Sequence, residues 1–371
     1  MFDFVTYMGI FLISSFFTKI YSKYYAKEKF FVRKFIVGFL AVVPILFLSI
    51  YRYEVGNDYR NYIKMFNLYI NEGSKVFFYY FPNSSLGTIA LAEIGKVIFG
   101  SAEGVLAVYS ILTFLLLFFS ILYYKDRIDI FIGIFLMYVL FFPASMNTIR
   151  QMLAVSIILF SLRFLEKGNT IKYIVGVGIA FLVHNTSIIC LVFAFYMTDK
   201  NRLSKLIRKL MTILSWLFPF MIVFLFSYGR SLPGIGFLFE NYELSFNTEF
   251  IVDLVIRLLV YGIIFQKRKH YLKTDKFSGF YFSLAYLDLI FIISSFVFPW
   301  CYRLSYYTCI AQIFFVSKTC RNSRTIRNKY IRNCLFIVFY SFTFFMLFVL
   351  WERDGIVPYD TIFNHGISLW R

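Results

Sequence analysis

Arginine, glycine and aspartate stand close together directly after a long apolar run. Residues 51–59 read Tyr-Arg-Tyr-Glu-Val-Gly-Asn-Asp-Tyr. If the apolar run crosses a membrane, polar groups kept at such a depth are usually functional. We expect Arg52 to bind an anionic group and Asp58 to orient or deprotonate a hydroxyl, while Gly56 permits a tight turn between them. The alternative is an interfacial salt bridge that only anchors the loop.

A second polar pair, Arg150-Gln151, opens another apolar run. A guanidinium at a helix N-terminus adds its forked donors to the free backbone N–H groups there. Together these groups favour a phosphate, which arginine can hold through two parallel hydrogen bonds. The alternative is an arginine that only anchors the helix at the membrane surface.

A third cluster, His184-Asn185-Thr186, separates two short apolar runs. A neutral histidine can accept a proton from a sugar hydroxyl, because its pKa lies near physiological pH. His184 could equally cap the following helix together with Asn185, or donate a hydrogen bond to a carbonyl group. The pattern leaves these roles open.

Two later segments carry weaker signals. Arg303 follows Trp300 at the start of an apolar run, where aromatic residues form either an interface belt or a stacking surface for sugars. Tyr359 lies in a Pro-Tyr-Asp segment near the end of the chain, which is either a substrate contact or a surface turn. Arg257 and Asp288 lie within apolar runs, and we expect them to pair in a structural or channel-lining role.

Several kinds of site are missing from the pattern. The sequence has no P-loop, no dinucleotide-binding glycine pattern and no Asp-x-Asp metal motif. Its five cysteines show no Cys-x-x-Cys spacing, so we expect neither a disulfide framework nor a metal site. We therefore predict no cofactor and no metal, and the natural ligand of the cationic residues is a phosphate carried by a lipid.

The elements that hold these residues are membrane helices. The chain is 60% hydrophobic and only 16% charged, whereas soluble proteins average about 25% charged residues. The composition predicts an all-α polytopic membrane protein. We expect about twelve transmembrane helices, at roughly 4–18, 35–50, 104–123, 128–142, 151–165, 171–183, 186–197, 210–228, 250–266, 277–298, 304–317 and 333–351. The amphipathic stretch 84–99 is predicted to be a re-entrant or interfacial helix, and Asp58–Ile70 an interfacial one.

The distribution of charge predicts the orientation. Six short segments (19–34, 125–129, 163–172, 198–209, 267–276 and 318–332) hold 27 of the 38 Lys and Arg residues. They fall between alternate apolar runs, which is typical of cytoplasmic loops and argues against nucleic-acid binding. The polar clusters then lie outside, with external loops at 51–103 and 229–249. We expect residues 1–371 to form a single transmembrane domain without a cleavable signal peptide.

Three motifs resemble those of the Wzy/EpsG-type polysaccharide polymerases. The segment from Arg52 to Tyr59 is similar to that family's Arg…Val-Gly-Thr-Asp-Tyr signature, with Asn57 in place of the common Thr. Arg150-Gln151-Met-Leu-Ala is similar to its Arg-Gln-x-Leu-Ala helix start. The segment 179–187 is similar to its Ile-Ala-x-x-x-His-x-Ser/Thr-Ser turn, and Arg303 and Tyr359 match later landmarks more loosely.

The resemblance implies a GT-C-related fold and a glycosyltransferase of the bacterial inner membrane, with its active site facing the periplasm or exterior. It would transfer a growing glycan from undecaprenyl pyrophosphate to a lipid-linked repeat unit of O-antigen, capsule or exopolysaccharide. A chain-length regulator protein is an implied partner, and no nucleic acid is expected.

On this reading, Asp58 and His184 are the candidate catalytic bases, and the choice between them stays open. The predicted pyrophosphate and substrate contacts are Arg52, Tyr59, Arg150, Gln151, Asn185, Arg303 and Tyr359. The alternatives are an O-antigen ligase or other GT-C-like glycosyltransferase, a lipid-linked sugar flippase or transporter, and a non-catalytic assembly partner. A flippase should show internal repeats and polar sites in the middle of the membrane, and neither is evident.

Overall fold

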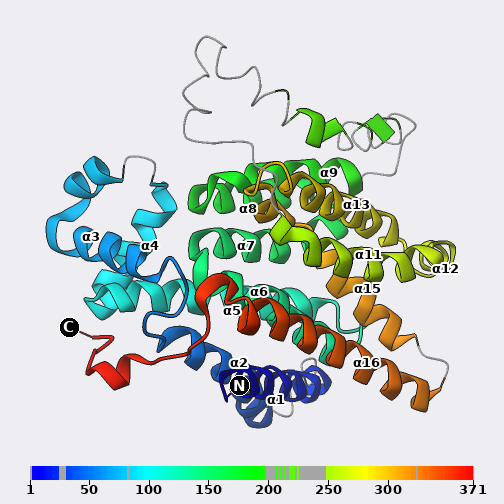
Figure 1. Ribbon diagram of the computed structural model, residues 1–371, viewed down its shortest axis with the longest axis horizontal. Helices are drawn as coiled ribbons and strands as arrows, with labels where there is room; N and C mark the ends of the chain where they lie inside the picture. Colours follow the sequence, from blue (N-terminus) through cyan, green and yellow to red (C-terminus); the bar gives the residue numbers. More distant parts are fainter. Residues whose placement is uncertain are drawn as a thin grey trace. The chain divides into compact units, whose positions relative to one another are not determined.

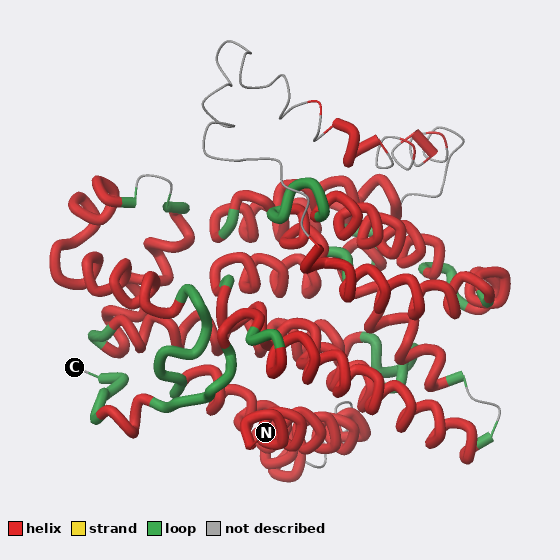
Figure 2. The backbone as a smooth tube through the Cα atoms, viewed as in Figure 1, coloured by secondary structure: helices red, strands yellow, loops and turns green. Residues whose placement is uncertain are grey.

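The computed structural model describes residues 2–24, 31–81, 84–197, 248–322 and 325–370, with short pieces between 206 and 224. Helices account for nearly all of this described part, and it contains no β-strand (Figures 1 and 2). One isolated antiparallel bridge joins Arg52 to Thr361. A fully helical chain is expected of a membrane protein, because a helix satisfies its own backbone hydrogen bonds where no water is present.

The longer helices are labelled in Figure 1. Their bounds are α1 Phe2–Tyr24, α2 Phe31–Ile50, α3 Tyr59–Tyr80, α4 Leu86–Phe99, α5 Ala102–Tyr123, α6 Ile130–Asn147, α7 Ile149–Glu166, α8 Thr170–Val183, α9 Val192–Met197, α11 Ile251–Gln266, α12 Arg268–Thr274, α13 Ser278–Ser295, α14 Cys301–Ser305, α15 Ile310–Arg321 and α16 Ile326–Phe344. The described residues also contain shorter helical segments at Asn185–Leu191, Thr248–Phe250, Phe345–Leu350, Arg353–Gly355 and Ile362–His365.

Six of the described helices are long and apolar enough to cross a membrane. They correspond to α1, α2, α5, α6, α13 and the combined segment Ile326–Leu350. The prediction of a polytopic helical membrane protein is therefore supported, while the number of twelve spans stays a prediction. The 84–99 stretch is helical as α4, and α3 begins at Tyr59 as expected. Most of the predicted span 210–228 and of the loop 229–249 lies outside the described residues.

Two compact units make up the structure. Unit 1 comprises Met1–Phe164, Ile171–Ile188 and Val316–Arg371, and unit 2 comprises Leu165–Thr170 and Ile189–Phe315. The prediction of a single transmembrane domain stays a prediction. Eight of the nine predicted site residues belong to unit 1, and Arg303 belongs to unit 2.

Local sequence signals explain where the central helices of unit 1 begin. The Ser101 hydroxyl caps α5 by accepting a hydrogen bond from the Gly104 amide at 3.0 Å. The Asp129 carboxylate caps α6 by accepting from the Phe131 amide at 3.2 Å and from the Ile132 amide at 3.4 Å. Each cap directly precedes an apolar run, so these signals set the starts of both helices.

Opposite ends of α6 carry opposite kinds of residue. At its start, Lys329 Nζ lies 2.8 Å from Asp129 Oδ2, and Arg321 donates a hydrogen bond to the Lys125 carbonyl at 2.7 Å. The basic loops of unit 1 therefore meet at this end. The other end of α6, one helix length of 18 residues or about 27 Å away, leads into Arg150.

Candidate functional site

The loop that carries Arg52 is held by the C-terminal segment of the chain. The Tyr53 amide donates to the Asp360 carbonyl at 2.9 Å, and the Ile362 amide donates to the Tyr51 carbonyl at 3.0 Å. These hydrogen bonds flank the bridge between Arg52 and Thr361. The backbone at Arg52 is thus fixed by residues about 310 positions later in the sequence.

Gly56 brings this loop against the end of α6. Its φ is +100°, which favours glycine, and a Cβ at this position would overlap the Met146 carbonyl oxygen. The Gly56 amide also donates to the Gly355 carbonyl at 2.8 Å. Only glycine fits this close approach of two backbones, which explains the glycine between Arg52 and Asp58.

The Arg52 side chain is almost fully buried, with 1% of its surface exposed. Its Nη1 donates to the Met146 carbonyl at 2.6 Å, whereas Nε and Nη2 are buried and have no hydrogen-bond partner among the described residues. Leaving buried donors of a charged group unpaired is costly. Two donor groups of a buried cation are therefore unsatisfied in the described structure, and an anion would satisfy them.

Burial lowers the pKa of Arg52 to about 10, against the opposing influence of nearby tyrosines. The guanidinium therefore still carries its charge at neutral pH. It lies 5.8 Å from the centre of the Tyr59 ring. Tyr59 itself is buried, and its hydroxyl has no partner among the described residues. Burial, with Glu103 as a second cause, raises the pKa of Tyr59 and keeps this hydroxyl protonated as a donor.

Asp58 lies directly before α3, and its backbone and its carboxylate differ in their contacts. Its backbone amide donates to Asn147 Oδ1 at 3.0 Å, and Asn147 Nδ2 in turn donates to Asp354 Oδ1 at 3.0 Å. The half-buried Asp58 carboxylate does not cap α3 and makes no hydrogen bond or ion pair to any described residue. The backbone is positioned while the side chain remains available, as a base or an orienting group requires.

Arg150 lies in the first turn of α7, four residues after the Met146 carbonyl that Arg52 contacts. Its side chain is half-buried, and its Nε is buried with no partner among the described residues. Its neighbour Gln151 is buried. The turn 146–150 therefore brings Arg52, Asp58 and Arg150 to one end of unit 1, and their joint role in one site stays a prediction.

Aromatic side chains lie between the two arginines. The Tyr62 and Phe66 rings stack with centroids 6.2 Å apart, and the Phe66 and Tyr109 rings stack at 5.9 Å. Tyr62 lies within electrostatic range of Arg52, and Tyr109 within range of Arg150. Low-dielectric aromatic surroundings of this kind strengthen the attraction of a cation for an anion.

His184 follows the last residue of α8, and its amide closes that helix on the Ala180 carbonyl at 2.8 Å. It is half-buried, whereas Asn185 is exposed. A Cβ at Gly176 on α8 would overlap the Ser161 hydroxyl on α7. The two helices therefore pack closely, as an antiparallel pair. From this contact, Arg150 lies 11 residues back and His184 lies 8 residues on, or about 16 and 12 Å along their helices. Both residues therefore lie at the same end of the pair.

A family comparison bears directly on these residues. A model described as the EpsG family matches residues 35–361, which is most of the chain. The chain belongs to the EpsG family. No curated protein and no solved structure matches it. Membership in the EpsG family identifies a membrane protein of the polysaccharide-polymerase type, and the predicted family resemblance is confirmed.

Tyr359 lies within the EpsG-family match and holds the C-terminal segment in place. Its hydroxyl donates to the Leu48 carbonyl at 3.0 Å, and its ring meets the Tyr7 ring at a centroid distance of 5.9 Å. These contacts anchor the segment that supports Arg52. A direct substrate contact for Tyr359 stays a prediction.

Unit 2 of this EpsG-family chain carries its own charged residues. The guanidinium carbon of Arg303 lies 4.1 Å from the centre of the Trp300 ring. Its convergence with Arg52 and Arg150 stays a prediction. The predicted pairing of Arg257 with Asp288 is confirmed, since Arg257 Nε lies 3.1 Å from Asp288 Oδ2. Arg257 also contacts Asp253, at 3.3 Å, in a buried network.

The sequence analysis missed three residues at the site: Glu103, Asn147 and Asp354. Glu103 is 9% exposed in the first turn of α5 and lies within electrostatic range of Tyr59. An acidic residue two positions after the N-cap Ser101, at the start of an apolar run, is a detectable signal. Asn147 and Asp354 act through a hydrogen-bond bridge between distant segments, which no local pattern reveals.

Proposed function

We propose that this chain is a polysaccharide polymerase that transfers a growing glycan from undecaprenyl pyrophosphate to a lipid-linked oligosaccharide repeat unit. The observation that carries the proposal is the buried Arg52, with two unpaired donors, beside the turn that holds Arg150 and Asp58. A diphosphate is an anion that two guanidinium groups can hold together. EpsG-family membership supports the sugar-transferring chemistry.

In the proposed reaction, a hydroxyl oxygen of the acceptor sugar attacks the anomeric carbon of the donor glycan. The bond from that carbon to the diphosphate oxygen breaks, and undecaprenyl pyrophosphate leaves with its electron pair. Arg52 and Arg150 neutralise the charge that develops on the leaving group. The hydroxyl proton passes to the Asp58 carboxylate or to the His184 imidazole. Neither nucleotide nor metal takes part.

The difference between the two ends of unit 1 supports the proposed orientation. Lys329, Arg321 and Lys125 meet at the end of α6 remote from Arg150. Basic loops favour the cytoplasmic side, so the proposed site faces the periplasm or exterior of a bacterial inner membrane. Twelve spans and a GT-C-related arrangement complete the proposal, with a chain-length regulator as a further partner.

The test is polymerisation by the purified protein in liposomes that contain the lipid-linked repeat unit. Arg150→Ala should slow polymerisation by about 10²–10³-fold, as the loss of one electrostatic donor does, and leave single repeat units. Arg60→Ala is the matched control, because Arg60 is an exposed arginine that pairs with Glu54 beside the same loop and such pairs contribute little. Normal chain lengths in Arg150→Ala would refute the proposal.

An O-antigen ligase or another GT-C-like glycosyltransferase is the nearest alternative, since it would use the same donor. The acceptor separates the two. A polymerase extends a second lipid-linked repeat unit, whereas a ligase transfers the glycan to a different acceptor. Supplying the lipid-linked repeat unit as the sole acceptor should therefore yield a ladder of products.

A further inference from the structure

An apolar groove runs along unit 1 between α4, α5, α7 and α8. It has a volume of about 580 Å³, and Ser161 and Lys172 are its only lining residues with polar side chains. The small side chain of Ala90 lines the groove on α4. Because several lining side chains are exposed, such as Val175 at 56%, the groove opens toward the surface of the unit.

This groove begins at the candidate site. Leu153 lines it one turn after Arg150 on α7, and Val183, which directly precedes His184, lines it on α8. Along α7 the lining continues to Phe164, 11 residues or about 16 Å further. That is about half the thickness of a hydrocarbon core of roughly 30 Å. The proposed anion site is therefore followed along α7 by an apolar groove that covers about half of that thickness.

We propose that the groove holds the first isoprene units of the donor's undecaprenyl tail while the diphosphate lies against Arg150 and Arg52. This inference rests on the proposed function. A ligand that fits this arrangement has one compact anionic head and one long hydrocarbon tail. The head would lie at the arginines, and the tail would lie along the apolar groove that follows them. A ligand without a tail would leave the apolar part unused.

The groove acts by orientation rather than by hydrophobic transfer. Lipid tails already surround the undecaprenyl chain, so moving it into the protein gains little from leaving water. Holding the units next to the diphosphate instead restricts the angles at which the anomeric carbon approaches the acceptor, and such positioning contributes to rate. Filling the groove should therefore slow long-tailed donors selectively.

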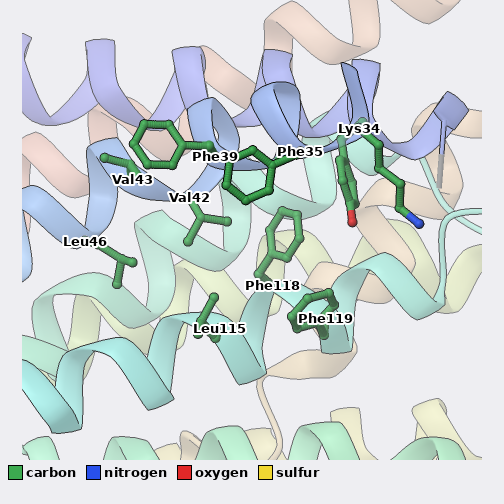
Figure 3. Close-up of a pocket in the computed structure, with 11 residues that line it drawn as sticks. Lys34, Phe35, Phe39, Val42, Val43, Leu46, Leu115, Phe118 and Phe119 are labelled. Atoms are coloured by element: carbon green, nitrogen blue, oxygen red, sulfur yellow. The ribbon is translucent and has the colours of Figure 1, made fainter. Parts of the chain in front are cut away.

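A second apolar groove in unit 1 offers a matched control. It lies between α1, α2 and α5, has a volume of about 350 Å³, and includes Val43 and Phe119 in its lining. Figure 3 shows its aromatic rings and the amine of Lys34 at one end. Lys34 lies near the start of α2, whereas Arg52 follows the end of that helix. This groove has similar chemistry but extends toward the basic end.

The experiment measures kcat/KM for two donors that carry the same glycan, one with an undecaprenyl tail and one with a two-isoprene tail. Ala90→Trp should lower the value for the long-tailed donor about tenfold and change that for the short-tailed donor less than about twofold, since only the long tail fills the groove. Val43→Trp should change neither value. On α8, Val175→Trp should repeat the selective loss, and Ile174→Trp, which does not line the groove, should not.

Each contrary outcome has its own meaning. Unchanged kinetics in both Ala90→Trp and Val175→Trp would show that bulk lipid fills the groove, and the inference would be overturned. Equal losses for the two donors would show damage to the site itself and would also overturn it. If the unmodified protein transfers from neither donor, the proposed function fails, and the groove assignment fails with it.

Discussion

At the scale of single residues, burial distinguishes Arg52 from an ordinary interface arginine. A surface arginine directs its guanidinium to water, whereas Arg52 is 1% exposed and donates a hydrogen bond to only one acceptor among the described residues. Keeping such a cation buried is unfavourable unless an anion compensates it. We therefore expect Arg52 to form part of a preformed anion site, which electrostatic catalysis requires.

Asp58 and His184 are the two candidates for the proposed general base. The Asp58 carboxylate is half-buried and makes no hydrogen bond to the described residues, while His184 ends α8 at the same end of unit 1. We expect Asp58→Asn to lower kcat by about 10²–10⁴-fold, the usual contribution of a general base, and His184→Ala to have a smaller effect. Asp58 is favoured because the turn that positions it also contacts Arg52.

The measurement is the pH dependence of kcat in both variants. If Asp58 is the base, Asp58→Asn should abolish the acidic limb of the profile, and His184→Ala should retain it. Loss of that limb in His184→Ala alone would assign the role to histidine. Binding of the donor, measured separately, distinguishes a lost base from a misplaced substrate.

At the scale of elements, a glycine joins the Arg52 loop to α6. Gly56→Ala places a methyl group on the Met146 carbonyl at a φ of +100°, so we expect the loop to shift and polymerisation to fall by at least about tenfold, as small misplacements near a site do. Gly73→Ala is the control, since Gly73 has a φ of +79° and open space around it. Equal activity in the two variants would contradict the close approach.

The C-terminal segment has a pH-sensitive contact of its own. His365 Nε2 lies 2.7 Å from Asp360 Oδ2, and hydrogen bonds from His365 and Asn364 lower the pKa of Asp360 to about 2. A carboxyl whose folded-state pKa is depressed stabilises the fold above its unfolded value, near 4, and loses that contribution as the pH falls toward 2. We expect the contact that supports the Arg52 loop to loosen in this window.

Hydrogen exchange of the Tyr53 and Ile362 amides, corrected for intrinsic rates, measures this loosening because both amides bond across the junction. Protection should drop between pH 4 and pH 2 in the unmodified protein. Asp360→Asn should be less protected at neutral pH and show no drop. A drop of the same size in Asp360→Asn would assign the effect to another group.

The positions of many helices could be predicted from the sequence. Helical periodicity and apolar runs are local properties, so the positions of α2, α5, α6, α7 and α8 follow from the sequence. The pairing of Arg257 with Asp288 was also predictable, because two opposite charges in apolar runs must compensate each other. The return of the C-terminal segment to residues 51–57 was not. It depends on backbone hydrogen bonds between segments about 300 residues apart, and such bonds leave no pattern in side-chain types.

For the molecule as a whole, the proposed function depends on which side of the membrane holds the site. Asn57 and Asn185 are exposed at the Arg150 end, and Lys329 lies at the basic end. In a background without native cysteines, we expect Asn57→Cys and Asn185→Cys to react with a membrane-impermeant maleimide added outside spheroplasts. Lys329→Cys should react only after permeabilisation. The reverse pattern would place the site in the cytoplasm and contradict the orientation.

A double-variant cycle for binding of undecaprenyl pyrophosphate tests most directly whether Arg52 and Arg150 share one diphosphate. If Arg52 and Arg150 hold the same diphosphate, their contributions are coupled. The Kd values of Arg52→Ala, Arg150→Ala and the double variant should then give an interaction energy of about 0.5–3 kcal/mol, whereas distant sites add within roughly 0.5 kcal/mol. A clear coupling is the predicted result. Weakened binding in both single variants with simple additivity, or unchanged binding in either, would contradict the shared site.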